Sequence, residues 1–392
     1  MWKHVVANVL TLLIVGFVVL GGVLAMGQRT FYAEGPLEQA ICLRVEPGAN
    51  LRAVTRSLER QEAISSPMLF RIGAQYTERD DRLRFGSYLI EPGASMDQIL
   101  DIVTRGGAST CGTEVVLRVG VTRSELLARE LDPATGRFEE LAVFAVDAEE
   151  RPEAFETVLA QADTRFRVTV VEGVTSWQVW SALSAAPFLD GELAEVPAEG
   201  RLAPGSYEVR RGHDRAALIA EIEARQQTIL DTAWENRAEG VPLSSPEEAL
   251  ILASIVEKEA GGPLELPQVA SVFYNRMASG MRFQMDATII YGITRGEGRL
   301  DRPIRRSDID GVTERQRHGA VLFNTYQIDG LPPTPIANPG RAAIEAVLNP
   351  DDTPYLYFVA DGTGGHAFAT NLADHNRNVA RWREIETQQR SQ

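Results

Sequence analysis

The chain has 392 residues, enough for two or three domains with buried cores. Its 39 Lys and Arg residues against 54 Asp and Glu residues give a net charge of −15, which argues against nucleic acid as the main ligand, because neutralising phosphates needs an excess of basic residues. The 44% hydrophobic content is that of a globular protein rather than a disordered one, and two Cys are too few for a disulfide-dense miniature or a four-cysteine zinc module.

An apolar segment opens the chain. Residues 5–26 carry no charge, and as a helix with about 1.5 Å per residue they would extend roughly 33 Å, enough to cross a bilayer core. Lys3 and His4 precede the run, so we expect a short cytoplasmic tail over 1–4, a transmembrane helix over 5–26 and export of the remainder. A cleaved signal peptide is the alternative, but its apolar region is normally shorter, about 7–15 residues.

Export permits a disulfide between the two cysteines. Cys42 and Cys111 each stand just before a strand-like run, Leu43–Val45 and Val115–Val119, and could join the ends of one small unit. Two buried free thiols are the alternative, because sequence spacing alone does not reveal the geometry. We predict the bridge.

Strand, turn and helix patterns recur between the apolar segment and residue 225. A β-rich run, a Gly turn and a helix-like period occur at 43–48 with 51–58, at 117–120 with 124–131, and at 168–173 with 177–183. Gly-Ser-Tyr at 86–88 and again at 205–207 precedes the helix-like segments 96–103 and 216–222. These repeats predict small α/β subdomains. The acidic stretch 132–164 is interpreted as an additional, solvated surface element.

From Gln226 onward the pattern changes to longer helices. Ser245-Pro246-Glu247-Glu248 has the form of a capping box with Pro at the first helical position, and Gly261-Gly262-Pro263 ends the predicted helix. Residues 249–256 between them contain one polar side chain, Ser254. A helix of this composition is buried on most sides.

Two glutamates follow this apolar run, and the helical period distinguishes them. The residues three, four, seven and eight positions before Glu259 are bulky aliphatics, whereas those before Glu257 are smaller and more polar. Glu259 also lies in the last helical turn, where the helix dipole disfavours negative charge. Both effects raise its pKa, and a carboxyl that stays protonated near neutral pH can act as a general acid in glycosidic bond cleavage. A surface Glu paired with a basic residue is the alternative.

Other polar residues of the C-terminal half fall in turn-rich motifs that could line a cleft. They are Gln284, Asp286, Asn324, Tyr326, His366 and Thr370. Tyr355–Val359 predicts a buried strand before the last two. A metal site is weakly supported because His366 and His375 lack HExxH spacing, and no GxSxG elbow supports a serine nucleophile. The Gly and Pro residues could also simply fix turns.

Seven short motifs occur in order along this half. They are Ala253–Glu259, Val272–Arg276, Gln284-x-Asp286, Asn324-Thr325-Tyr326, Gly330–Pro333, Tyr355–Val359 and Gly365-His366-x-Phe368. With the N-terminal segment they resemble the MltG (YceG-like) family, membrane-anchored endolytic murein transglycosylases. The resemblance implies an α+β fold, with a LysM-like subdomain over 40–107, a second α/β region over 110–225 and a mixed α/β lytic transglycosylase catalytic domain over 226–385.

The resemblance also implies the reaction. Family members cleave the β-1,4 bond between N-acetylmuramic acid (MurNAc) and N-acetylglucosamine (GlcNAc) in nascent glycan strands, leaving a 1,6-anhydro-MurNAc end and terminating elongation. Glu259 matches the catalytic Glu, and the six polar residues named above are expected to bind substrate. The nucleophile is the C6 hydroxyl of MurNAc itself, so we expect no metal and no organic cofactor.

Expected partners are peptidoglycan glycan strands, the membrane and candidate peptidoglycan synthases, with no nucleic acid. The expected location is the inner (plasma) membrane, single-pass, with a periplasmic catalytic part.

The chain departs from the family pattern at three places. Glu199–Tyr207 lacks the acid of the family's Glu-Gly-x-x-x-Pro-Asp-Thr-type motif, Thr334 replaces a Gly after the Pro pair, and 115–164 looks inserted. None of these touches Glu259. Two alternatives stay open: a hydrolytic muramidase with Asp286 as second carboxylate, and a non-catalytic scaffold that binds peptidoglycan through its N-terminal modules.

Overall fold

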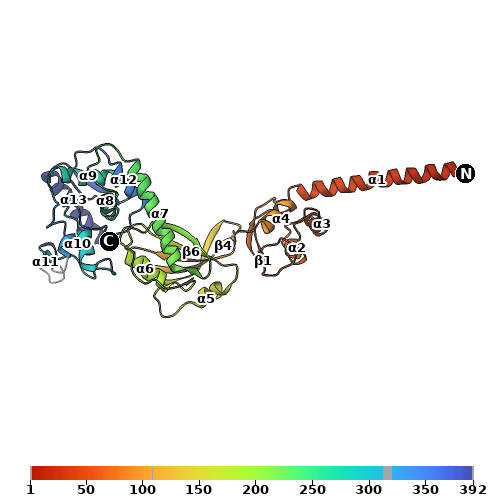
Figure 1. Cartoon of the computed structure of the whole chain (residues 1–392), viewed down its shortest axis with the longest axis horizontal. Helices are drawn as coiled ribbons and strands as arrows, with labels where there is room; N and C mark the ends of the chain where they lie inside the picture. Colours follow the sequence, from red (N-terminus) through yellow and green to blue (C-terminus); the bar gives the residue numbers. More distant parts are fainter. Residues whose placement is uncertain (1, 108, 312–319, 391–392) are drawn as a thin grey trace. The chain divides into compact units, whose positions relative to one another are not determined.

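The computed structural model describes residues 2–107, 109–311 and 320–390, with a mixture of helices and short sheets (Figure 1). The chain divides into two compact units, which are described separately. Unit 1 comprises Met1–Val115, Leu127–Val143 and Glu150–Phe166. Unit 2 comprises Val116–Leu126, Phe144–Glu149 and Arg167–Gln392.

Helix α1 (Trp2–Tyr32) contains the predicted apolar segment and extends beyond it at both ends. Within it, Ala7–Tyr32 has a mean hydropathy of 2.7 and is long and apolar enough to cross a membrane. A signal sequence at an N-terminus would meet the same criterion. Residues 2–4 of the predicted tail already belong to the helix, and Met1 lies outside the described residues.

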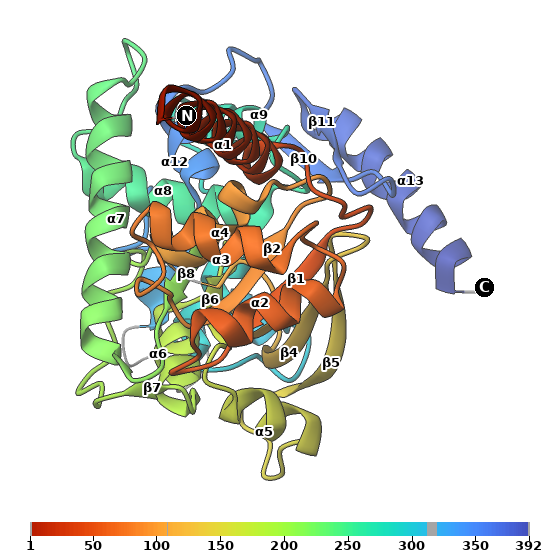
Figure 2. The same ribbon diagram turned by 90° about the vertical axis from the view of Figure 1, so that its right-hand side faces the viewer.

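After α1, unit 1 packs three helices on a two-stranded sheet. The elements are β1 (Ile41–Val45), α2 (Leu51–Arg60), α3 (Pro67–Tyr76), β2 (Gly86–Ile90) and α4 (Met96–Arg105) (Figure 2). Strands β1 and β2 pair antiparallel, with Leu43 opposite Tyr88. Leu43, Phe70 and Leu100 are fully buried in the shared core. The strand–turn–helix patterns predicted at 43–58 and 86–103 are therefore confirmed.

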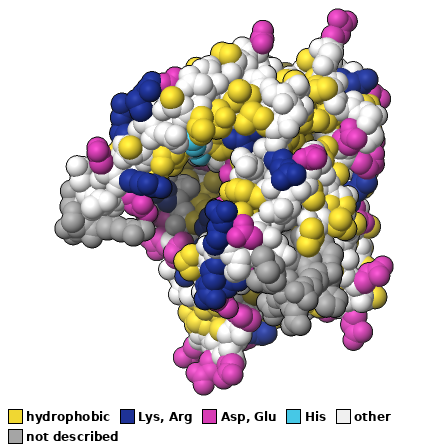
Figure 3. All heavy atoms as spheres, turned by 90° about the vertical axis from the view of Figure 1, so that its left-hand side faces the viewer, with side chains coloured by type: hydrophobic (Ala, Val, Ile, Leu, Met, Phe, Trp, Pro, Cys, Tyr) yellow, Lys and Arg dark blue, Asp and Glu magenta, His cyan; other side chains and the backbone are white. Residues whose placement is uncertain are grey.

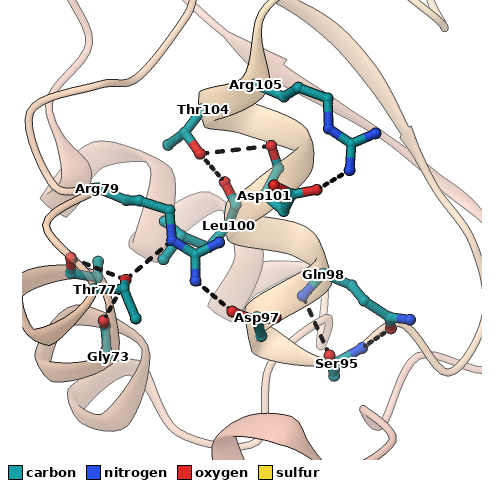
Figure 4. A network of polar contacts seen from close by, with 11 residues as sticks. Gly73, Thr77, Arg79, Ser95, Asp97, Gln98, Leu100, Asp101, Thr104 and Arg105 are labelled. Carbon is teal, nitrogen blue, oxygen red and sulfur yellow. Dashed lines mark hydrogen bonds and ion pairs between the residues drawn. The ribbon is translucent and has the colours of Figure 1, made fainter.

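Polar contacts connect α3 with α4 (Figure 4). Ser95 and Gln98 form a reciprocal capping box at the start of α4, in which the backbone N–H of Gln98 donates to Ser95 Oγ over 3.2 Å and Gln98 Oε1 accepts from Ser95 N over 2.8 Å. Arg79, just beyond α3, forms an ion pair with Asp97 in the first turn of α4. Its Nε also donates to Thr77 Oγ1 at 3.0 Å. These contacts hold the end of one helix against the beginning of the next.

The two cysteines form a disulfide. Cys42 of β1 is joined to Cys111, with their Cα atoms 5.7 Å apart, so the predicted bridge is confirmed. The backbone N–H of Cys111 donates to Ser87 O in β2 over 3.1 Å. The chain leaving α4 is thereby attached to both strands of the small sheet.

A five-stranded sheet follows, in the order β5-β4-β3-β6-β8. Its strands are β3 (Thr113–Val119), β4 (Ser124–Asp132), β5 (Arg137–Ala145), β6 (Arg165–Val170) and β8 (Gly205–Val209). The helix predicted at 124–131 is wrong, because these residues form β4. Their helix-favouring composition is overridden by pairing in the sheet, where Leu126 and Ala128 are buried at a spacing of two. Strand β5 is mostly exposed, as expected of a solvated addition, and α5 (Glu153–Ala160) follows it.

Most of unit 2 is helical, and its elements follow in chain order. They are α6 (Ser176–Ala185), β7 (Leu189–Asp190), β9 (His213–Asp214), α7 (Arg215–Glu235), α8 (Pro246–Glu259), α9 (Leu266–Ala278), α10 (Asp286–Thr294), α11 (Arg306–Ile309), the 3-10 helix η2 (Ala320–Phe323), α12 (Arg341–Leu348), β10 (Tyr357–Ala360), β11 (His366–Ala369) and α13 (Leu372–Arg390). Strand β7 pairs parallel with β9. The domain start expected at residue 226 falls inside the continuous helix α7.

Helix α8 lies at the centre of this unit and packs against α9 and α12 (Figure 1). All residues from Ala249 to Val256 are buried, as predicted. The hydroxyl of Ser254, the one polar residue among them, donates to Ile251 O over 2.7 Å and accepts from Ile336 N over 3.0 Å.

The N-terminal cap of α8 differs from the predicted box in one contact. Ser245 Oγ accepts from Glu248 N over 3.2 Å as expected. In a capping box the Glu248 carboxylate would accept from the backbone N of Ser245. It accepts instead from Ser244 N, over 2.7 Å.

Strands β10 and β11 form an antiparallel hairpin with Phe358 opposite Phe368. The strand predicted at 355–359 begins at Tyr357 and is half-buried rather than buried. A two-stranded hairpin has no further strands beside it to complete the burial of its residues.

Candidate active site

Glu259 is the last helical residue of α8. Its side chain keeps partial exposure, and its carboxylate makes no hydrogen bond within the described ranges. Burial raises the pKa of Glu259 to about 7, and the negative charge of Asp286 adds to this effect. The helix-period argument therefore identified a carboxyl that holds its proton close to neutral pH.

Three basic residues act on the pKa of Glu259 in the opposite sense: His366, Lys258 and Arg276. Arg276 is buried on α9, where its Nε donates to Leu356 O over 2.7 Å. Lys258 Nζ donates to Gly173 O over 3.2 Å. Burial lowers the pKa of Lys258, although nearby carboxylates oppose this shift. Backbone oxygens thus hold the Arg276 and Lys258 side chains in place.

Glu257 has a different environment. Its Oε2 accepts a hydrogen bond of 2.9 Å from Gly340 N, at the start of α12. Burial raises the pKa of Glu257 too, but this hydrogen bond favours the ionised form and works against the shift. Glu257 therefore holds a backbone segment, whereas the Glu259 carboxylate is left open to a ligand.

Asp286 and Tyr326 form a second polar pair in the site. The hydroxyl of Tyr326 donates to Asp286 Oδ1 over 2.9 Å. Burial raises the pKa of Tyr326, and the charge of Asp286 adds to this effect. Thr325 fixes the arrangement, since its buried hydroxyl accepts from Met285 N over 2.8 Å at the start of α10.

The remaining predicted residues differ in how they are held. Gln284 has a left-handed backbone (φ 55°), and its N–H donates to Thr325 O over 3.1 Å. Asn324 is buried; its Nδ2 donates to Ile309 O over 3.0 Å and its Oδ1 accepts from Tyr326 N over 3.1 Å. The Asn324 amide thus positions Tyr326.

His366 is the first residue of β11, and Thr370 follows the last. His366 Nδ1 lies 2.8 Å from Glu265 Oε2. Thr370 is exposed just after the strand. The structure therefore brings Asp286, Tyr326 and His366 close enough to Glu259 to interact with it electrostatically. Gln284 and Thr370 form no hydrogen bond with Glu259 in the described part of the chain.

The sequence analysis missed two carboxylates, Glu199 and Glu265. Burial raises the pKa of Glu199 to about 7, although a hydrogen bond of 2.8 Å from Ser176 N opposes the shift. Its charge also acts on Lys258, the neighbour of Glu259 in the chain. The Glu-Gly motif at 199–200 was the available signal for Glu199, whereas Glu265 had none beyond the Gly-Gly-Pro turn before it.

A hollow is visible on the face of the molecule in Figure 3, with a histidine at its margin and hydrophobic and basic side chains around it. Two depressions, of about 470 and 610 Å³, are lined by none of the predicted site residues. Within the described residues, no group of three His, Cys, Asp or Glu side chains is placed to hold a metal ion.

Comparison with known proteins gives a consistent picture. The model of the YceG-like family matches residues 43–381. An endolytic murein transglycosylase of Bacillus subtilis (strain 168) is 25% identical over 365 residues, which cover 92% of this chain and 89% of that protein. One from Streptococcus pneumoniae (D39) is 26% identical over 87% of this chain, which spans only 58% of that protein's length. A crystal structure of a YceG-like protein from Listeria monocytogenes has a TM-score of 0.46 and 21% identity, covering 86% of this chain and 98% of that one.

Proposed function

Because this chain belongs to the YceG-like family, we propose that it is an endolytic murein transglycosylase that cuts peptidoglycan glycan strands. The bond cleaved is the β-1,4 linkage between MurNAc and GlcNAc in nascent strands. The products are a 1,6-anhydro-MurNAc end and a free GlcNAc 4-hydroxyl, which terminates elongation of the strand.

The environment of Glu259 is the observation that carries this proposal. A general acid must hold a proton at working pH and have it available to the leaving oxygen. The raised pKa of about 7 and the unengaged carboxylate of Glu259 satisfy both requirements. Glu257 meets these requirements less well. The hydrogen bond from Gly340 N favours its ionised form and occupies one of its two carboxylate oxygens.

In the mechanism, Glu259 donates its proton to the bridging oxygen as the glycosidic bond breaks. The C6 hydroxyl of the same MurNAc attacks C1 and loses its proton, which the Glu259 carboxylate can accept. Because the nucleophile belongs to the substrate, no activated water and no second catalytic carboxylate are needed. Asp286 and Tyr326 would bind the sugar beside the cleavage point, supported by their electrostatic coupling to Glu259.

The rest of the chain would hold this domain at its substrate. We propose that α1 anchors the protein in the inner membrane with a single pass and leaves the catalytic part periplasmic, supported by the apolar stretch Ala7–Tyr32. Residues 40–107 would act as a LysM-like module that contacts glycan. Peptidoglycan synthases, which make the nascent strands, are the proposed protein partners.

The decisive experiment compares Glu259→Gln with Glu257→Gln. Gln is nearly isosteric, but it can neither give nor take the proton, so Glu259→Gln should lose activity by at least about 10²–10⁴-fold. Glu257→Gln should retain substantial activity, because its amide oxygen can still accept from Gly340 N. The measurement is the mass of fragments released from purified sacculi, together with a thermal melt of each variant.

Product mass and variant activity distinguish the alternatives. An anhydro end is one water lighter than a reducing end, so reducing ends would identify a hydrolytic muramidase, with Asp286 as the group that positions water. Absence of cleavage by the folded wild-type protein would favour the binding scaffold. Full activity of Glu259→Gln would exclude the proposed acid.

A further inference from the structure

Glu265 and His366 form a pair beside Glu259. Glu265 Oε1 accepts from the backbone N of His366, and Oε2 lies at the ring Nδ1, both at 2.8 Å. Oε2 also accepts from Gly261 N over 3.2 Å, in the turn directly after α8. One carboxylate therefore joins the segment that follows Glu259 to the first residue of β11.

This carboxylate is held closely by its surroundings. A Cβ atom on Gly365 would lie 2.6 Å from Glu265 Oε1, and one on Gly261 would lie 2.3 Å from Gly364 O. The contact at Gly261 is with backbone and cannot be relieved by a side-chain movement, so the loop after α8 approaches Gly364 this closely because position 261 is Gly. A side chain at position 365 would instead displace the Glu265 carboxylate from its present position. The side chains of Glu265 and His366 are 21% and 15% exposed, respectively.

The contact with Glu265 determines which ring nitrogen carries the proton. Burial works to raise the pKa of Glu265, but its hydrogen bonds with His366 and Gly261 prevail and lower it, so Glu265 is an anion that accepts. A neutral His366 must then carry its hydrogen on Nδ1, leaving the lone pair on Nε2. Nε2 makes no hydrogen bond to any residue that the structure describes, and the ring lies edge-on to Phe358 at 5.3 Å.

We propose that His366, oriented by Glu265, is the base that takes the proton from the MurNAc C6 hydroxyl while Glu259 acts as the acid. This inference rests on the proposed function and divides its two proton transfers between two residues. The hydrogen bond from Gly261 N to Glu265 Oε2 supports it, because it ties the Glu265–His366 pair to the turn that directly follows Glu259. Glu265 is a positioning residue in this scheme.

The step is balanced. O6 of MurNAc bonds to C1 and gives its proton to His366 Nε2, while the bond between C1 and the GlcNAc O4 breaks and Glu259 gives its proton to O4. The products are the anhydro sugar, the free GlcNAc hydroxyl, a Glu259 carboxylate and a His366 imidazolium. Transfer of the proton from His366 to Glu259 restores the starting state without an external reactant.

Two variants of the full-length protein test the proposal. His366→Gln removes the base, and Glu265→Gln places an N–H opposite Nδ1 and so favours the wrong tautomer. Both should lower kcat for release of anhydro ends by about 10²–10⁴-fold, with KM nearly unchanged. Glu247→Gln, at an exposed Glu in the first turn of α8, is the matched control and should retain wild-type kcat.

Nitrogen NMR of the ¹⁵N-histidine-labelled protein in detergent provides a readout independent of activity. The His366 signals, assigned by their loss in His366→Gln, should show the hydrogen on Nδ1 in the wild type and on Nε2 in Glu265→Gln. The inference is overturned if the wild type carries the hydrogen on Nε2. It is also overturned if both variants keep wild-type kcat while Glu259→Gln is inactive, in which case the proposed function stands. An active Glu259→Gln would instead overturn the proposed function.

Discussion

At the scale of the residue, the site contains two carboxyls whose ionisation is disfavoured by burial. Glu259 and Glu199 both have pKa values raised to about 7, and burial is the main cause for each. A carboxyl in such a place costs folding free energy whenever it ionises. This free-energy cost depends on pH, because it arises only when the carboxyl loses its proton. It can be measured by replacing Glu259 with Gln, which has nearly the same volume and no charge.

The first prediction follows from the sign of that pKa shift. Between the ordinary pKa of 4.5 and the folded value of about 7, the folded state binds more protons than the unfolded chain, so stability falls as pH rises. For Glu259 the full difference is at most about 3 kcal/mol. Glu259→Gln should therefore equal the wild type in free energy of unfolding at pH 4 and exceed it at pH 8. Denaturant titrations at the two pH values measure this.

A control separates burial from charge removal in general. Glu247 is exposed and forms a surface ion pair with Arg201, so its replacement by Gln should not reproduce the gain in stability at pH 8. A Glu259→Gln protein no more stable than the wild type at pH 8 would mean that Glu259 is solvated in the folded state. The basis for its role as an acid would then be lost.

At the scale of the element, local signals and distant contacts account for different parts of the fold. Helix α8 could be predicted because its cap, its apolar run and its terminating glycines are all adjacent in sequence. Strand β4 could not, since its residues favour a helix and only pairing with β3 and β5 makes them a strand.

The same distinction applies to the site. Glu259 could be ranked above Glu257 from the period of one helix. Glu265 could not be found, because its partner His366 is 101 residues away and the two meet only through loops that tertiary structure brings together.

The disulfide between β1 and the segment before β3 gives the second prediction, which belongs to the scale of the element. It closes a loop of 69 residues, for which the chain-entropy relation gives about 4 kcal/mol of stabilisation. The double variant Cys42→Ser/Cys111→Ser should lower the free energy of unfolding of unit 1 by about this amount, while the transition of unit 2 stays in place. Tryptic fragments followed along a urea gradient report the two units separately.

Alkylation provides the control for this experiment. Without reductant, the native protein should take up no alkylating agent at Cys42 or Cys111, and after reduction it should take up two groups. Two modified cysteines before reduction would contradict the bridge. If unit 1 of the double variant had the same free energy of unfolding as in the wild type, the predicted stabilisation by the disulfide would be wrong.

At the scale of the whole molecule, one apolar helix precedes every other described element. The stretch Ala7–Tyr32 is long and hydrophobic enough to span a bilayer, and Lys3 and His4 are the basic residues ahead of it. Basic residues at the start of a membrane helix favour retention of that end in the cytoplasm. The proposed substrate lies on the opposite side, and a disulfide also requires an oxidising compartment.

The last prediction is therefore the topology. Alkaline phosphatase fused after Gln392 should be active, because it folds only when exported, whereas a cytoplasmic reporter at the same position should be inactive. Deleting residues 5–26 should exchange the two results, since no other helix in the described residues is long and apolar enough to cross a membrane. Membrane fractionation of the full-length fusion distinguishes an anchor from a cleaved signal, because only an anchored chain keeps its full mass and stays with the membrane after a carbonate wash. Activity of the cytoplasmic reporter at this position would reverse the assigned orientation, and with it the access of Glu259 to periplasmic glycan.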